Sequence, residues 1–403
     1  MNAIATPGPF ELLMMILLGG GGGLSSGLPP GPEDPQLANI APAECLYFTS
    51  WAGTVLPEAG SSNATEQLLA EPEVAAFLAR VGMLQNLQPL LERAGAMGIF
   101  QVHPRAQPLL ADISQLLQLI HGKPGAIYIS QVSLRKRRPM EVSGGAMFRV
   151  GADGGPIGQL LKKITSRLPV ESIRSVRIDD LPFSRIEFES SAMIMEWALV
   201  EGTLIVGLGD HSAAELLQRR EAKPPTWLTA IRAKLEVPRV AAISVLDLTA
   251  VMRLVDTADD SLRVRLVLET LGFDQLQTLA TVQGMDETGC VSRTLLTVDG
   301  RGDGLLEWID ASPLTEDPLA IIPGDAVVAA TCRLNLAQLF DTWLEMMEQI
   351  EPRAADQMRA EMTEGARQLG YDLRDDILST IGGSWRIFAG PGPAELITGW
   401  TIA

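Results

Sequence analysis

The chain is most constrained by residues 321–388, whose pattern describes a complete unit of strand, helices and returning strand. Turn residues precede a short apolar run, Ala326–Cys332, which predicts a mostly buried strand. Apolar residues then recur at helical spacing from Leu336 to Ile350, and Asn335 stands where an N-cap is expected. The pattern therefore predicts a strand that leads directly into a long amphipathic helix.

The second half of this unit is equally well marked. Pro352 interrupts the first helix, and the helical stretch that follows should end at Gly370, because glycine adopts the left-handed C′ conformation without steric cost. Asp372 is placed to cap a further short helix. Trp385–Phe388 then predicts a returning strand.

Residues 240–296 show the same order of patterns earlier in the chain. The corresponding landmarks are Leu246–Leu248 with Leu334–Leu336, Leu271–Asp274 with Leu369–Asp372, and Val282–Gly284 with Ile381–Gly383. Cys45–Trp51, a strand-like run entered through Pro42 and Glu44, suggests a third and weaker copy. The repeated order predicts a duplicated supersecondary unit in which each copy buries its apolar face against its neighbours.

Between these landmarks the chain alternates helices with strands on short connections. Two hairpins are expected: Ser175–Ile178 with Ser184–Phe188 over Asp179–Pro182, and Met193–Val200 with Thr203–Gly207 over Glu201–Gly202. Such connections are too short for a parallel crossover, so the strands should pair antiparallel. The expected fold class is α+β, with antiparallel sheets covered by helices.

A length of 403 residues exceeds what one core usually organises and favours two folded domains. The expected division is a leader and linker at 1–39, a first α+β domain at 40–236 and a second at 237–403. The chain stops inside a strand-like run, Leu396–Ala403, so a complete and a truncated second domain both remain open.

The first residues form an apolar segment, Phe10–Leu18, followed by a run of glycines. The segment has the length of a signal-peptide core and is too short to span a bilayer. Because no lysine or arginine precedes Arg80, a cleaved signal and an uncleaved, membrane-associated leader remain as alternatives. Pro29–Pro35 predicts an extended linker.

The formal charge of −17 argues against a nucleic-acid or anionic-membrane surface, which would require clustered lysine and arginine. The densest basic cluster, Arg135–Arg138, lies between two strand-like runs and is expected to be a solvated hairpin tip. Any membrane contact should therefore come only through the N-terminal apolar segment.

Three cysteines, Cys45, Cys290 and Cys332, are widely spaced and form no CxxC motif. One disulfide with a free thiol and no disulfide at all are both compatible with this spacing. Cys290 and Cys332 lie at or inside apolar strand-like runs, which predicts buried structural thiols.

Two short motifs resemble ligand loops without completing them. Gly207–Ser212 lies between a strand and a helix, as a dinucleotide loop does, but Ser212 replaces the third glycine and forms a capping-box spacing with Glu215. Asp299–Gly304 resembles a calcium loop, although Arg301 occupies a ligand position. A capped turn and a solvated turn are the better interpretations.

The remaining candidate residues are scattered. His103, His121 and His211 lack the spacing of a zinc site or a triad. Acids that could serve acid–base chemistry, but that are more commonly turn residues, are Asp179, Asp180, Asp256, Asp259, Asp260 and Asp372. Trp343, Met346 and Met347 could line an apolar groove, with core packing as the default. The sequence thus assigns no catalytic, cofactor-binding or metal-binding residue, and no cofactor.

The segments Pro42–Cys45, Ser50–Gly53 and Asn63–Glu73, together with the Leu-Gly-aromatic-Asp turns, resemble a family of uncharacterised bacterial proteins that are often exported and known only as a domain of unknown function. The resemblance covers most of the chain after Ile40. It implies repeated strand–helix–strand units, an envelope location and members that continue past this point, and it carries no catalytic residue.

These observations favour a non-enzymatic envelope protein with a binding or scaffold role, whose partner would be an unknown protein or an apolar ligand. Two alternatives stay open. A carboxylate-based hydrolase would require a polar cleft that holds Asp256 or Asp372 with a raised pKa. A carrier of an apolar ligand would require a continuous cavity lined by methionine and leucine.

Overall fold

The structure is a computed structural model of the chain. The residues it describes are 27–82, 107–120, 122–133, 141–167, 173–188, 193–258, 262–300, 320–324, 326, 328–381, 383–389 and 400–402. The chain forms two compact units, one of residues 1–254 with 278–296, and one of residues 255–277 with 297–403.

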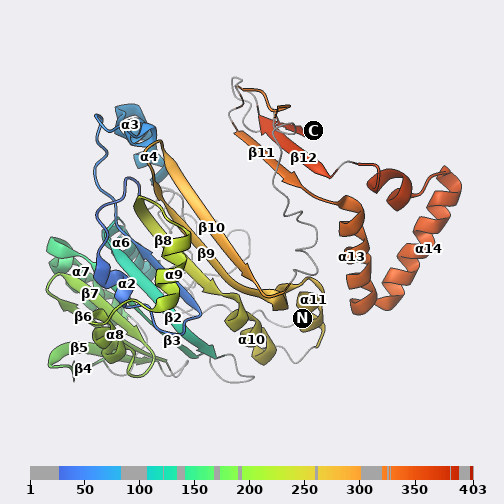
Figure 1. The fold of residues 1–403 in the computed structure, drawn as a ribbon. Helices are drawn as coiled ribbons and strands as arrows, with labels where there is room; N and C mark the ends of the chain where they lie inside the picture. Colours follow the sequence, from blue (N-terminus) through green and yellow to red (C-terminus); the bar gives the residue numbers. More distant parts are fainter. Residues whose placement is uncertain are drawn as a thin grey trace. The chain divides into compact units, whose positions relative to one another are not determined.

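The first unit is built on a ten-stranded antiparallel sheet (Figure 1). Its order is β10-β9-β8-β1-β2-β3-β7-β6-β5-β4. The strands are β1 (Tyr47–Trp51), β2 (Gly125–Ser133), β3 (Glu141–Arg149), β4 (Ile173–Ile178), β5 (Leu181–Phe188), β6 (Met193–Val200), β7 (Thr203–Leu208), β8 (Arg239–Asp247), β9 (Leu276–Met285) and β10 (Cys290–Val298). The expected α+β class with an antiparallel sheet and helices is confirmed.

Both expected hairpins are present, β4–β5 and β6–β7. Asp179 and Asp180 have φ of 46° and 62°, and Glu201 and Gly202 have φ of 48° and 73°. Two successive positive φ angles are the signature of the tight turns whose twist matches that of antiparallel strands. The first turn is therefore shorter than expected, and Leu181 and Pro182 belong to β5.

Helices cover both faces of this sheet. One core contains Phe48, Tyr128 and Ile243 from the strands and packs against α2 (Pro35–Asn39), α8 (Ser212–Arg220) and α9 (Thr226–Lys234). The opposite core contains Ile127, Phe148 and Leu204 and packs against α6 (Gln107–Ile120) and α7 (Gly154–Arg167). Neighbouring residues such as Ile127 and Tyr128 enter different cores because strand side chains alternate between faces.

The expected extended linker at Pro29–Pro35 leads directly into helix α2, which begins at Pro35. Asp34 caps α2 by accepting a hydrogen bond from the Gln36 N–H at 2.9 Å, and its carboxylate forms an ion pair with Arg149 at 2.5 Å. Leu37, 3% exposed, belongs to the first core. The proline-rich segment is folded because it leads into a capped helix whose apolar side is buried, a feature that composition alone does not show.

The compact units also divide differently from the expected boundary at residue 236. Strand β8 pairs antiparallel with β1, with Tyr47 opposite Leu246 and Thr49 opposite Ser244. Backbone hydrogen bonds thus join the start and the middle of the chain in one sheet, and the first unit runs to Leu254 before the chain leaves it.

The second unit has a smaller sheet of order β11-β12-β13, formed by β11 (Val328–Arg333), β12 (Ser384–Ala389) and β13 (Trp400–Ile402). Between β11 and β12 lie α13 (Leu336–Ile350) and α14 (Pro352–Leu369), a helical hairpin divided at Pro352 (Figure 1), and a π-helical turn, η7 (Leu373–Leu378). Asn335 caps α13, Gly370 ends α14 with φ of 80°, and Asp372 caps η7, as expected.

The order of elements in 240–296 matches that in 321–388. Strand β8 is followed by α10 (Leu248–Ala258), α11 (Leu262–Thr270), a short 3-10 turn and β9, which returns antiparallel to β8. Asp247 accepts a hydrogen bond from the Ala250 N–H as Asn335 does from Gln338, and Gly272 has φ of 77°. The agreement concerns order and local geometry, so the duplication itself stays a proposal.

Candidate functional site at the β8–β10 end of the sheet

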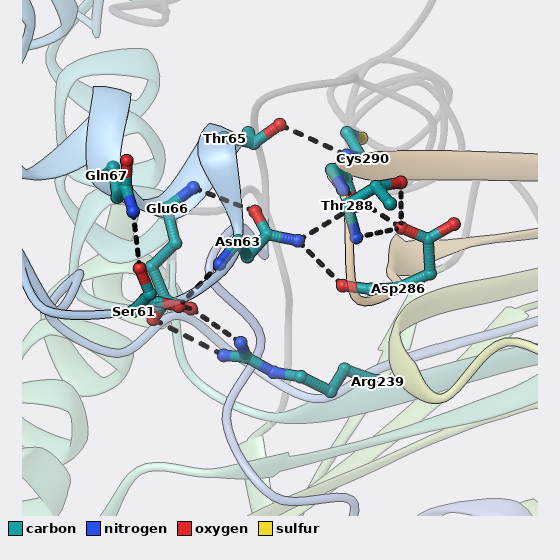
Figure 2. Close-up of polar contacts among 10 residues, drawn as sticks. Ser61, Asn63, Thr65, Glu66, Gln67, Arg239, Asp286, Thr288 and Cys290 are labelled. Carbon is teal, nitrogen blue, oxygen red and sulfur yellow. Dashed lines mark hydrogen bonds and ion pairs between the residues drawn. The ribbon is translucent and has the colours of Figure 1, made fainter.

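Helix α3 (Ala64–Ala70) contacts the turn between β9 and β10 through its N-cap residue, Asn63. The Asn63 side-chain amide donates to the backbone carbonyl of Asp286 at 2.7 Å and to that of Gly289 at 3.2 Å (Figure 2). Its carbonyl oxygen accepts from the Glu66 N–H at 2.9 Å. One buried side chain therefore caps a helix and binds a hairpin distant in the sequence.

An ion pair with a buried carboxylate supports this contact. The carboxylate of Glu66, whose side chain is 4% exposed, lies 2.6 Å from Nη1 of Arg239 and accepts a hydrogen bond from the Ser61 hydroxyl at 2.9 Å (Figure 2). The spacing of Asn63 and Glu66 predicts a capping box, but Glu66 binds Arg239 instead, and the Asn63 N–H donates to Ser61. Arg239, at the start of β8, carries no sequence signal for this role.

The hydrogen bonds from Arg239 lower the pKa of Glu66 below its ordinary value. The carboxylate is thus held as an anion by a fixed cation, which is the opposite of the raised pKa that a general acid needs. The geometry assigns Glu66 and Arg239 to holding α3 against the edge of the sheet.

An open pocket of about 470 Å³ lies on the first-core face of the sheet. Its lining consists of Glu33, Arg232, Leu235, Glu236, Val237, Pro238, Val240, Ile243, Val282 and Arg293. The floor comes from β8 and β9, one wall from the end of α9 and the segment after it, and Arg293 projects from β10. The volume lies in the range of small-molecule sites.

The charges of this pocket are only partly paired. Arg232 forms an ion pair with Glu33 at 2.5 Å. Within the described part of the chain, Glu236 forms no hydrogen bond or ion pair, and Arg293 makes no such direct contact but lies close enough to Asp286 to help lower the pKa of that carboxyl. The pocket therefore combines an apolar floor with one cation and one anion at its rim, neither of which is held in a direct ion pair.

The strand-to-helix turn at Gly207–Ser212 is confirmed, but Ser212 is not its cap. His211 holds the N-cap position with φ of 61°, and the Ser212 hydroxyl donates to the Leu208 carbonyl at 2.5 Å. Gly209 has φ of 95° and supplies the tight turn. His211 is exposed and lies 3.2 Å from Asp210, away from the pocket lining.

The other acids singled out by sequence serve turns and surface pairs. Asp179 and Asp180 form the β4–β5 turn, Asp256 lies 3.5 Å from Arg265, and Asp372 accepts the N–H groups of Arg374 and Asp375. None of these acids lines the pocket. His103, His121, Arg135–Arg138, Asp259, Asp260 and 301–304 of the calcium-like loop lie outside the described residues.

The expectation of buried thiols at Cys290 and Cys332 is wrong, since both are exposed and all three cysteines are free. Cys290 begins β10 and Cys332 lies on β11, the end strands of the two sheets, so apolar neighbours in the sequence do not bring burial. Cys45 is half-buried, and desolvation raises the pKa of its thiol to about 12. A neutral thiol of this kind is a poor nucleophile.

Trp343 is 36% exposed, and its ring lies 6.0 Å from that of Phe340. Met346 and Met347 are half-buried on the same helix. The full burial expected of a core stripe is therefore not reached in this unit.

No group of histidine, cysteine and acidic residues with metal-binding geometry occurs among the described residues. In the same part of the chain, no helix has the length and apolar character needed to cross a bilayer. Comparison with known proteins returned no matching family model, no curated protein and no solved structure.

Proposed function

We propose that this protein is a non-enzymatic binding protein of the cell envelope, and that the pocket at β8–β10 holds a small apolar or amphipathic ligand. The observation that carries the proposal is the make-up of the pocket: an apolar floor of Val240, Ile243 and Val282 with the exposed Arg293 at the rim. Such a combination would bury a hydrocarbon body and leave a cation for an acidic head group.

The envelope location rests on a separate feature, the apolar segment Phe10–Leu18 near the start of the chain. Fractionation of the native cells tests it directly. Recovery of the protein in the periplasmic or membrane fraction supports the proposal, and recovery with the cytosol contradicts it.

Ligand binding is tested on the full chain with cis-parinaric acid, a fluorescent fatty acid, followed by displacement with an unlabelled fatty acid and the matching fatty alcohol. We expect saturable binding that Val240→Trp abolishes, because Val240 is half-buried at the pocket and the indole would occupy it. Arg293→Ala should weaken binding of the acid about tenfold and leave the alcohol unchanged, since a charged hydrogen bond is lost.

The matched control is Arg174→Ala, which removes an exposed arginine from β4, the strand at the opposite end of the sheet. It should bind as the unmodified protein does. Unsaturable binding, or equal binding by Val240→Trp, contradicts the proposal. Hydrolysis of an ester probe that Glu236→Gln abolishes would favour the carboxylate-based hydrolase instead.

A further inference from the structure

Strand β11 ends its sheet on one side, and within the described residues nothing pairs with its outer edge. Its sequence, Val-Ala-Ala-Thr-Cys-Arg, carries no charge before Arg333. Exposed strand edges are usually protected by charged side chains because they pair readily with other strands. Strand β4, which ends the larger sheet, has this protection along its length in Arg174 and Arg177, whereas the one charged residue of β11 is its last, Arg333.

The larger sheet shows how a strand in the position of β11 is completed. Strand β8 is the first strand of the stretch 239–298, and β11 is the first strand of the stretch 328–402. On one side, β8 pairs with β9, the strand that returns after the helices of its stretch. On its other side β8 pairs antiparallel with β1.

Strand β1 is itself the first strand of a similar stretch. It leads to the helix capped by Asn63, and the chain returns through Gly122, with φ of 75°, to β2, which pairs antiparallel with β1. The junction therefore joins two first strands edge to edge. In the order β3-β2-β1-β8-β9-β10, the two first strands, β1 and β8, lie at the centre. Each is followed outward by its returning strand, β2 or β9, and then by the next strand of the chain, β3 or β10.

An antiparallel junction between two like strands is the arrangement that a two-fold axis generates between identical chains. We propose that a second copy of this chain supplies a neighbour for the outer edge of β11, so that two β11 strands pair antiparallel and the two small sheets form one. Each copy then contributes the same surface, the outer edge of its β11 strand, to the interface. Backbone hydrogen bonds between the two strands form the contact, as in other cases of strand addition.

The β1–β8 junction also indicates which residues meet. Ser244 lies opposite Thr49 at that junction, and their hydroxyls are 2.9 Å apart. Ser244 stands two residues before Leu246, as Cys332 stands two residues before Leu334 in the corresponding landmark. Cys332, which is exposed, is therefore expected near the two-fold axis and close to Cys332 of the second copy.

The first test measures the mass of the full chain by sedimentation equilibrium under reducing conditions. We expect a dimer with twice the monomer mass. Cys332→Asp and Cys332→Lys should each raise the dissociation constant at least about tenfold, because like charges would meet at the axis. An equimolar mixture of the two variants should restore the dimer, which also shows that both variants are folded.

The control is Cys290→Lys, which places a charge at an exposed cysteine on β10 and should leave the dimer unchanged. A monomeric wild-type chain, unaltered dimers of both Cys332 variants, or no recovery on mixing each overturns the proposal.

Oxidation provides an independent readout that needs no charged variant. Mild oxidation of the dimer should give a disulfide-linked species whose bridging peptide contains Cys332, and Cys332→Ser should abolish it while Cys290→Ser does not. A product linked through Cys290, or no linked product, overturns the pairing of β11.

Discussion

The two stretches that share an order of elements, 239–298 and 328–402, differ sharply in burial. Strand β8 has four residues below 10% exposure, Ala241, Ala242, Ile243 and Val245. In the stretch 328–402, the buried residues of the described part are small or polar: Ala337, Thr342, Ala355 and Ala389. Caps and left-handed glycines agree between the stretches, so local geometry is shared while packing is not.

The difference follows from neighbours rather than from composition. Strand β8 lies between β9 and β1, and its first-core face is covered by α9 and the segment after it. Strand β11 has β12 alone among the described strands. The comparison shows that local sequence sets the order of elements, and that burial depends on which segments from elsewhere reach them. Four measurements test this comparison.

The largest contrast is expected for isoleucine-to-alanine substitutions. Ile243→Ala in β8 removes a side chain that is 1% exposed and should cost about 2–5 kcal/mol through lost burial and a cavity. Ile387→Ala in β12 removes one that is 37% exposed and should cost less than about 1 kcal/mol. Urea unfolding followed by circular dichroism measures both. Equal losses would contradict the difference in packing.

The ion pairs should differ in the same direction. Arg239→Met leaves the buried Glu66 carboxylate without its cation and should cost about 1–3 kcal/mol, less than for a fully buried pair, because Arg239 is itself 40% exposed. Arg374→Met removes the partner of Asp341 from an exposed pair and should cost less. Glu66→Gln combined with Arg239→Met should recover part of the loss in urea unfolding. A double variant no more stable than Arg239→Met would argue against the pair.

Substitutions at the two helix-ending glycines should have equal effects, about 1 kcal/mol each, because a β-carbon is strained at a positive φ whatever the packing. Gly272→Ala and Gly370→Ala test this at φ of 77° and 80°. Gly365→Ala, inside α14, is the control and should stabilise slightly. A large difference between Gly272→Ala and Gly370→Ala in thermal unfolding would show that these turns are not locally determined.

The smallest effect is expected in the pH dependence. The pKa of Glu66 is lowered in the folded protein, so its contribution to stability is present above the ordinary pKa of 4.5 and is lost as pH falls through the folded value. The urea midpoint of the wild type should therefore fall more between pH 6 and pH 3 than that of Glu66→Gln. Identical pH profiles of the wild type and Glu66→Gln would contradict a contribution of the ionised Glu66 carboxylate to stability.

Sequence patterns predicted elements whose cause is local. Asn335, Pro352 and Gly370 mark the helices of the second unit where the structure has them, and Glu201–Gly202 marks a hairpin turn. Each of these residues acts through its own backbone preference or through an atom a few positions away. Such effects can be read from one sequence.

The features that sequence did not show depend on distant partners. The Glu66–Arg239 pair joins residues 173 positions apart, and the capping-box spacing suggested a local partner for Glu66 instead. The pocket was missed because its lining comes from Glu33, α9, β8, β9 and β10. Cys290 was expected to be buried because nothing in its neighbours shows that β10 ends a sheet.

The β1–β8 junction also has a consequence for how the chain is made. During synthesis Tyr47 leaves the ribosome long before its partner Leu246 exists, so one edge of β1 remains open while the intervening strands are translated. Nascent chains that halt before β8 would carry this edge as a site for aggregation. The larger sheet is therefore completed only after β8 has been translated. When a ribosome slows or stalls before β8, the N-terminal part of the sheet is the part exposed to aggregation.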